Sequence, residues 1–202
     1  MSFASFPNRP SDPSGSYPRR DRPGLLTTSN ANANAATVSF NASVMDSPQV
    51  VQKFLQFLLR QGDRALIPVE TISEIITIRV PEVLPVPQMR DCVLGVYNWR
   101  GEMLWIVDLG EAIGFPALFG GKRPPETAIV IAIESGDQTI GFVVPQVLDL
   151  EVYNLQQQQE PDPQLFPASV LPFLSGYFID NNNEISIAID VPSIFQVLQQ
   201  GL

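Results

Sequence analysis

Histidine is absent from this sequence of 202 residues, and cysteine occurs once, as Cys92. Without histidine the chain cannot form a Ser-His or Cys-His nucleophile pair, a histidine proton shuttle or a histidine-ligated metal site. A single cysteine excludes an internal disulfide and a thiolate zinc site, and it favours a reducing compartment. The glycine patterns of phosphate-binding and dinucleotide-binding loops are missing as well. We therefore expect no enzyme activity, no cofactor and no metal.

Cationic residues are scarce: 12 Lys and Arg stand against 21 Asp and Glu, which gives a net charge of -9. This acid excess disfavours binding to nucleic acid or to an anionic membrane surface. The sequence contains no apolar run of the roughly 18 residues that a membrane span needs, and its N-terminus lacks the apolar core of a secretory signal. We expect a cytoplasmic protein with no direct membrane insertion.

Residues 1–48 differ from the rest of the chain. They are rich in proline, and their apolar residues are scattered, so that burial cannot offset the entropy cost of ordering. Four arginines against three aspartates give this segment a charge of +1, and the remainder of the chain carries the whole acid excess. The sequence predicts a disordered tail over residues 1–48 and a folded domain over residues 49–202.

Short apolar and β-branched runs, separated by turn residues, predict an all-β fold with a few short helices. Residues 53–59 and 64–69 are predicted to form one hairpin, and residues 95–108 another. Short helices are predicted at residues 88–93 and 109–113. The 19 prolines of the chain also favour such a loop-rich β fold over a helical bundle.

The folded part contains an internal duplication, with a first copy at about residues 53–115 and a second at about 127–202. The segment Ile72-Ser-Glu-Ile75 returns as Val147-Leu-Asp-Leu150, and the order of strands and turns around it is the same in both copies. Five predicted strands for each copy are too few for a propeller. They favour two small closed β-barrels side by side, because closure removes exposed strand edges.

Each copy ends its last hairpin with an aspartate, Asp108 in the first and Asp190 in the second. Aspartate is a preferred residue immediately before a helix, where its carboxylate accepts a hydrogen bond from the first turn. We therefore interpret both residues as helix N-caps rather than as a catalytic pair of acids.

The most informative turn is Asn98-Trp-Arg-Gly101. Gly101 can adopt a left-handed backbone, and Asn98 can bond the turn. Trp99 and Arg100 are residue types that dominate protein interfaces, although Trp99 could also fold back over its own hairpin. Glu74 is a second candidate for a partner-binding residue. The alternative is that it simply occupies an outward-facing position of a strand. An exposed Glu74–Arg100 pair would add only about 0–1 kcal/mol to folding, whereas its disruption under a partner could cost about 2–5 kcal/mol.

The segment Gly95-Val-Tyr-Asn-Trp-Arg-Gly101, followed by Ile106-Val-Asp-Leu109, resembles the signature of CheW-like domains, with Trp99 in place of the usual leucine. The segment Ile72-Ser-Glu-Ile75 and the first predicted hairpin are also similar to that family. The resemblance covers residues 53 to about 198, and it implies two five-stranded SH3-like β-barrels.

What the resemblance implies about function is a non-enzymatic adaptor. Such domains couple chemoreceptor or photoreceptor tips to the regulatory domain of a CheA-type histidine kinase, in chemotaxis, phototaxis or twitching motility. The protein would then lie at receptor arrays near the inner membrane through its partners. The resemblance pairs Arg100 with Glu74, and it places Ile72 and Gly95 near the partner surfaces. The partner-binding residues predicted in this way and from the turn are Ile72, Glu74, Gly95, Asn98, Trp99, Arg100 and Gly101.

Two other readings of the sequence remain open. One is a small β-barrel module that binds a ligand or nucleic acid and has no link to chemosensing; the acid excess and the lack of a basic, aromatic-lined groove stand against it. The other is an enzyme that relies on carboxylates alone.

Overall fold

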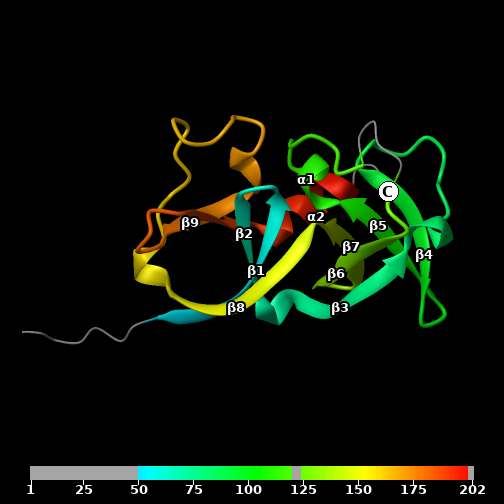
Figure 1. Cartoon of the computed structure of the whole chain (residues 1–202), viewed down its shortest axis with the longest axis horizontal. Coiled ribbons are helices and arrows are strands. Elements are labelled where there is room, and N and C mark those ends of the chain that lie inside the picture. Colours follow the sequence, from blue (N-terminus) through cyan, green and yellow to red (C-terminus); the bar gives the residue numbers. More distant parts are fainter. Residues whose placement is uncertain (1–49, 120–123, 200–202) are drawn as a thin grey trace, which may run out of the picture. The chain divides into compact units, whose positions relative to one another are not determined.

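The computed structural model describes residues 50–119 and 124–199, so the predicted tail over residues 1–48 lies outside the described residues. Within the described ranges the chain forms two five-stranded β-sheets with short helices (Figure 1). The strands are β1 (Val51–Arg60), β2 (Asp63–Pro68), β3 (Ile72–Arg79), β4 (Val93–Trp99), β5 (Glu102–Asp108), β6 (Thr127–Ser135), β7 (Gln138–Val144), β8 (Gln146–Asn154), β9 (Leu174–Ile179) and β10 (Ile185–Ile189). The helices are α1 (Leu109–Ala112) and α2 (Val191–Gln199), with 3-10 turns η1 (Val69–Thr71), η2 (Val80–Glu82), η3 (Leu155–Gln157) and η4 (Leu171–Phe173).

The predicted hairpins and the helix after Asp108 are confirmed, but the predicted helix at residues 88–93 is wrong. That segment follows a proline-rich stretch, and Gln88 adopts a left-handed backbone with φ 64°. The carbonyl of Cys92 accepts a hydrogen bond from the Asp108 amide at 2.8 Å. The segment forms turns instead of a helix, and one of them is closed by a hydrogen bond from the Val93 amide to the Arg90 carbonyl at 2.9 Å.

The two copies exchange hairpins. One sheet has the strand order β8-β1-β2-β10-β9, and the other has the order β3-β6-β7-β5-β4. The hairpin β1–β2 of the first copy therefore completes a sheet made of second-copy strands, and β6–β7 of the second copy completes the sheet of the first. The two orders become identical when each first-copy strand is matched to its second-copy equivalent. The two five-stranded sheets are as predicted, but the expectation that each copy builds its own barrel is corrected.

In each sheet a backbone bridge joins one outer strand, β4 or β9, to the segment that follows the other outer strand, β3 or β8, and closes the sheet into a barrel. In the first, Leu84 and Val96 exchange hydrogen bonds at 2.9 and 3.0 Å; in the second, Gln159 and Tyr177 do so at 2.9 and 3.0 Å. A glycine makes each close approach possible. A Cβ on Gly95, whose φ is +141°, would lie 2.2 Å from the Leu84 carbonyl oxygen.

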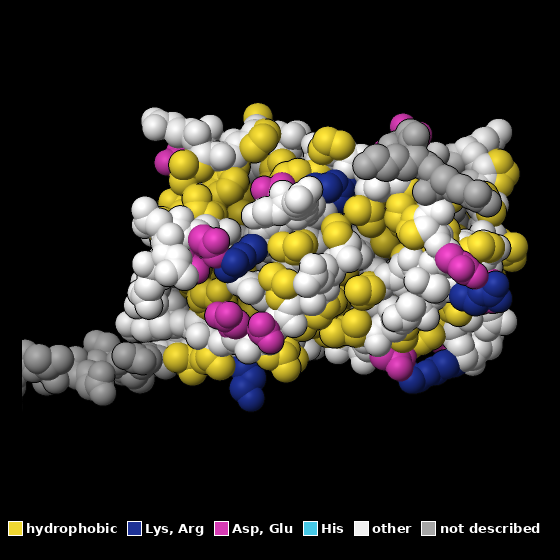
Figure 2. All heavy atoms as spheres, in the orientation of Figure 1, with side chains coloured by type: hydrophobic (Ala, Val, Ile, Leu, Met, Phe, Trp, Pro, Cys, Tyr) yellow, Lys and Arg dark blue, Asp and Glu magenta, His cyan; other side chains and the backbone are white. Residues whose placement is uncertain are grey.

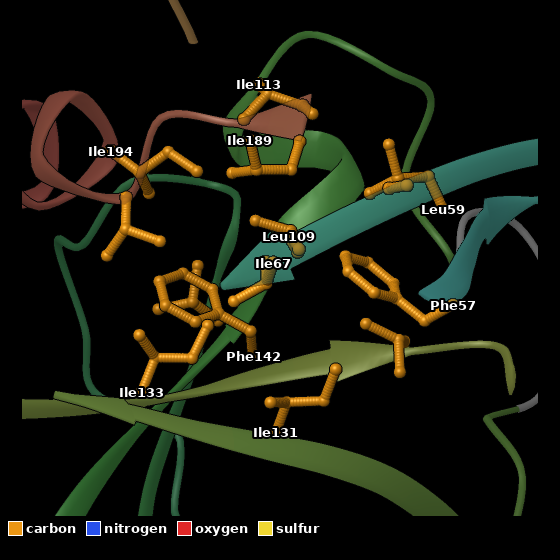
Figure 3. Close-up of a cluster of buried hydrophobic side chains, with 14 of the residues drawn as sticks. Phe57, Leu59, Ile67, Leu109, Ile113, Ile131, Ile133, Phe142, Ile189 and Ile194 are labelled. Carbon is orange, nitrogen blue, oxygen red and sulfur yellow. The ribbon is translucent and has the colours of Figure 1, made fainter. Parts of the chain in front are cut away.

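The largest hydrophobic cluster lies between the two sheets and takes residues from both (Figure 3). Phe57 and Ile67 come from the exchanged hairpin of one sheet, and Ile131 and Phe142 come from that of the other. Smaller clusters fill the interior of each barrel. Strand β1 is buried on both faces, because its side chains point alternately into the shared core and into one barrel. This explains why its sequence is an almost continuous apolar run.

Asp108, at the end of β5, connects the exchanged hairpin β1–β2 to the sheet that contains β5. Its carboxylate is 1% exposed and lies 3.3 Å from the Arg60 guanidinium at the end of β1. The same carboxylate caps α1 by accepting the Glu111 amide at 3.2 Å, and it also accepts the Leu118 amide. Arg60 donates in addition to the Pro116 carbonyl. Asp190 caps α2 through the Ser193 amide at 3.1 Å, which confirms both predicted caps.

The two caps give a matched pair of stability variants. We expect Asp108→Ala to lower the free energy of unfolding by about 3–5 kcal/mol, because it removes the cap and leaves Arg60 without its buried carboxylate. We expect Asp190→Ala, which removes a cap alone, to cost about 1 kcal/mol. Urea unfolding of both variants measures the difference. Equal losses would show that the Arg60–Asp108 pair adds nothing to the cap.

Candidate functional site

The turn between β4 and β5 has the geometry of a two-residue hairpin loop. Trp99 and Glu102 are the last cross-strand pair, and the two residues between them, Arg100 and Gly101, have φ of 56° and 88°. Positive φ at both central positions defines a type I′ turn, whose twist matches that of the flanking strands. The Asn98 side chain accepts a hydrogen bond from the Gly101 amide at 2.9 Å, as predicted from the sequence.

Glu74, Trp99 and Arg100 form one contact cluster, which we call the Glu74 cluster. The Arg100 guanidinium donates to Oε1 of Glu74 at 2.8 Å, and the Trp99 indole N–H donates to Oε2 at 3.0 Å. The guanidinium carbon lies 5.3 Å from the centre of the Trp99 ring, which places the cation over the aromatic face. Both carboxylate oxygens of Glu74 are therefore used by the same hairpin tip.

The Glu74 cluster joins the two outer strands of its sheet, β3 and β4. Glu74 lies on β3, where it pairs with Ala132 of β6, and the hairpin tip belongs to β4. The Trp99 ring packs against the hydrophobic cluster inside that barrel, together with Ile76 and Tyr97. Trp99 thus folds back over its own hairpin, which is one of the two roles considered for it from the sequence. Its indole N–H points at Glu74. The tryptophan ring holds the base of the cluster, and Arg100 stays 70% exposed at its top.

Folding gains little from an arginine at position 100. A non-glycine residue in the left-handed region costs about 1–2 kcal/mol relative to its preferred backbone. An ion pair as exposed as Arg100–Glu74 contributes about 0–1 kcal/mol to the free energy of unfolding. Asparagine or glycine would suit the same turn position better. The stability of the fold therefore does not explain the arginine at position 100.

The second copy has no equivalent of this cluster, although it repeats the surrounding strands. Asp149 of β8 stands where the first copy has Glu74. Within residues 50–119 and 124–199, the Asp149 side chain has neither a hydrogen bond nor an ion pair. The turn between β9 and β10 is longer, and Asp180 closes it by accepting the Asn182 and Glu184 amides at 2.8 and 2.9 Å. The Glu74 cluster is thus an addition to the duplicated fold.

Ile72 and Gly95 lie outside the Glu74 cluster. Ile72 pairs with Ile133 and packs against the shared core, and Gly95 is buried where it allows the barrel to close. Two exposed apolar side chains in this region were not predicted: Ile75 on β3 is 43% exposed, and Met103 on β5, which pairs with Asn98, is 72% exposed. The signal was present for Met103, which is an apolar residue on the outward side of a predicted hairpin.

The site has none of the features of a metal or nucleophile centre. Among the described residues, no group of three acidic or cysteine side chains could hold a metal ion. Cys92 is buried, and this burial raises the pKa of its thiol, so that less of the reactive thiolate is present. What the Glu74 cluster offers is a rigid, charged and aromatic protrusion on a β-scaffold.

Comparison with known proteins identifies the family and supports the fold. The family model of the CheW-like domain matches residues 53–199. The chain belongs to the CheW-like domain family. A solved structure, the scaffolding protein TtCheW from Thermoanaerobacter tengcongensis, matches with a TM-score of 0.63 and 18% sequence identity, over 76% of this chain and 98% of that one. A search of the curated proteins returned no match.

The CheW-like family is a family of chemotaxis scaffolds, which are non-enzymatic and which in general connect receptors with the kinase CheA. The similarity to TtCheW adds agreement in fold. In the described ranges of this CheW-like chain, no helix has the length and apolar character needed to cross a membrane.

Replacement of Arg100 by asparagine tests whether folding needs the Glu74 cluster. We expect Arg100→Asn to leave the free energy of unfolding unchanged or to raise it by up to about 1 kcal/mol, because asparagine tolerates the left-handed backbone. Gly101→Ala, in the neighbouring position with φ 88°, is the control and should cost about 1–2 kcal/mol. Chemical unfolding of the two variants measures both. A loss above about 1 kcal/mol in Arg100→Asn would make the arginine a structural residue.

Proposed function

We propose that this CheW-like protein is a stand-alone adaptor that couples the cytoplasmic tip of a chemoreceptor or photoreceptor to the regulatory domain of a CheA-type histidine kinase. The adaptor acts by binding and has no turnover of its own. It serves chemotaxis, phototaxis or twitching motility, and it lies at receptor arrays near the inner membrane through its partners.

The observation that carries the proposal is the exposed Arg100 held in place by Glu74 and Trp99. Two contacts fix Glu74, and the ring below fixes the guanidinium, so the cluster loses little side-chain entropy when a partner covers it. A partner would also desolvate the ion pair, whose disruption then costs about 2–5 kcal/mol instead of the 0–1 kcal/mol of an exposed pair. The same cluster thus contributes more to association than to folding.

The exchanged hairpins suit an adaptor that carries a signal between two partners. The shared core takes residues from both sheets, and packed interiors are close to crystalline density. A partner that binds one barrel therefore acts on a single rigid body, because the shared core prevents the two barrels from moving freely relative to each other. The family resemblance adds that the kinase carries a regulatory domain of the same fold, so that one barrel can pack against another.

The alternative of a ligand- or nucleic-acid-binding barrel finds less support. The acid excess that the sequence places on the folded part opposes phosphate binding. Of the described cationic side chains, Arg60, Arg64, Arg79 and Arg100 are each within 4.0 Å of a carboxylate. These arginines do not form a basic groove.

Reversal of the charge at position 100 tests the proposed function. We expect Arg100→Glu to raise the Kd for the regulatory domain of the CheA-type kinase by about 30-fold or more, because two mutually repelling carboxylates would replace the ion pair under the partner. The melting temperature should stay within about 3 °C of the original value. Isothermal titration and thermal unfolding of the full chain measure the two quantities.

Arg64→Glu is the matched control, because Arg64 forms an exposed ion pair with Glu184 at 2.6 Å on the other sheet. It changes the net charge by the same amount, and we expect it to leave the Kd unchanged. Equal weakening by both variants would reduce the effect to overall charge and contradict the assignment of the site. Failure of the unchanged chain to bind the kinase domain would contradict the adaptor function itself.

A further inference from the structure

The barrel that contains β3 and β4, which we call the first barrel, has an apolar pocket at one end. The volume of this pocket is about 270 Å³, and every described side chain that lines it is hydrophobic. Its lining includes Ile78 of β3, Leu94 of β4 and Val143 of β7, which belong to the hydrophobic cluster inside the barrel or pack against it. The pocket is therefore an opening into the barrel interior.

The other barrel, the second barrel, has a pocket of similar size, and this pocket is polar. Its volume is about 300 Å³, and its lining includes Gln52, Gln158 and Ser175. The side-chain amide of Gln158 donates a hydrogen bond to the Ser175 carbonyl of β9 at 2.9 Å. Such a lining offers the hydrogen-bond partners that water in a pocket needs.

The two pockets occupy equivalent places in the duplicated fold. Val83 and Gln158 each come directly before the residue whose backbone bridge closes the barrel. Leu94 and Ser175 each come directly before the glycine next to that bridge. Ala128 pairs with the residue four places after Glu74, and Gln52 pairs with the residue four places after Asp149. At these three places, the polar lining of the second barrel is replaced by hydrophobic side chains in the first.

This replacement favours a ligand over water. A buried water molecule needs about two to four polar partners. The described side chains around the pocket of the first barrel offer none. Water is therefore poorly held there, and an apolar group that displaces it gains free energy.

Exposed hydrophobic side chains alone would not mark a binding site on this protein. Figure 2 shows them in several separate groups over one face, interspersed with charged and other polar side chains. Such scattered groups are ordinary on the surface of a folded protein. The pocket of the first barrel differs because it is concave and continues into a hydrophobic cluster, which is typical of ligand sites.

The volume of the pocket indicates the size of its ligand. A cavity of about 150 Å³ holds one benzene molecule, so that 270 Å³ holds about ten non-hydrogen atoms in proportion. A phenylalanine ring inserted by a protein partner would leave nearly half of this volume unfilled. A charged or strongly polar ligand group would lose its water without gaining a hydrogen bond from any described side chain of the lining.

We propose that the pocket of the first barrel binds a neutral, compact hydrocarbon or aromatic molecule of about ten non-hydrogen atoms. This site is separate from the Glu74 cluster. The pocket takes Ile78 and Leu94 from one end of β3 and of β4, whereas the cluster takes Glu74 and Trp99 from the other end. The ligand site therefore does not depend on the adaptor function proposed above.

Methyl NMR of the full chain tests the site, with naphthalene as the probe because it is a neutral bicyclic hydrocarbon of this size. We expect the methyl signals of Ile78, Leu94 and Ile106 to shift and to saturate with a Kd of about 100 µM or lower. The methyl signals of Leu66 and Leu155, which lie in the hydrophobic cluster of the second barrel, should stay in place.

Two variants make the same substitution on the two barrels. Val83→Gln gives the apolar pocket the residue of its polar counterpart, and we expect it to raise the Kd for naphthalene about tenfold or more. Val152→Gln replaces an exposed valine of β8 in the second barrel, and we expect it to leave this Kd unchanged. The dispersion of the remaining methyl signals checks that both variants fold.

Titration of the unchanged chain decides the proposal even if a variant does not fold. Saturable shifts that are confined to the pocket, and that Val83→Gln alone weakens, support it. Absence of shifts up to the solubility of naphthalene, equal shifts in both barrels, or equal binding by all three chains would overturn it. If the kinase domain shifts the pocket signals and naphthalene does not, the pocket belongs to an anchoring side chain of the partner, which also overturns it.

Discussion

Exchange of hairpins between the two copies is the constraint on which the rest of the structure depends. Neither copy can complete its sheet alone, since β6–β7 lies between β3 and β5 and β1–β2 lies between β8 and β10. Because of the exchange, both faces of β1 pack in hydrophobic clusters, and one continuous core lies between the two sheets. The Glu74 cluster rests on this arrangement, because β3 and β4 are both held in place by a hairpin of the other copy.

Most strands could be predicted from the sequence, but their partners could not. Apolar periodicity and turn residues are local properties, so the Asp108 and Asp190 caps and the Asn98 turn were recognisable in advance. The choice between pairing β1 with β8 and pairing it with β3 leaves the same residues in strands and buries the same faces. Only the long-range register separates the two, and a single sequence does not contain it. The segment at residues 88–93 was wrongly predicted to be helical for a related reason. The Cys92 carbonyl accepts a hydrogen bond from the Asp108 amide, and this long-range contact cannot be read from the local sequence.

The candidate site, like the fold, could be predicted only in part from the sequence. The Arg100–Glu74 pair was expected from the family resemblance, and the structure places the two side chains 2.8 Å apart. The hydrogen bond from the Trp99 indole to Glu74 was not expected, because it depends on the side-chain rotamer of a tryptophan that stands where the CheW-like signature has leucine. The asymmetry between the copies was also hidden, since Asp149 looks equivalent to Glu74 until the tip of the β9–β10 hairpin is seen to be longer and polar.

The exchange also sets the order in which the chain can fold as it is synthesised. Gln56 in β1 donates a hydrogen bond to Ser186 in β10, 130 positions later. At about 5–20 residues per second, a ribosome needs on the order of ten seconds to make that stretch. Throughout that time the hairpin β1–β2, whose Phe57, Leu66 and Ile67 are fully buried in the finished fold, has emerged without β8 and β10, the strands that will flank it. Nascent chains with this topology need protection from aggregation until the last strand is released, and a barrel built from one copy alone would escape that requirement.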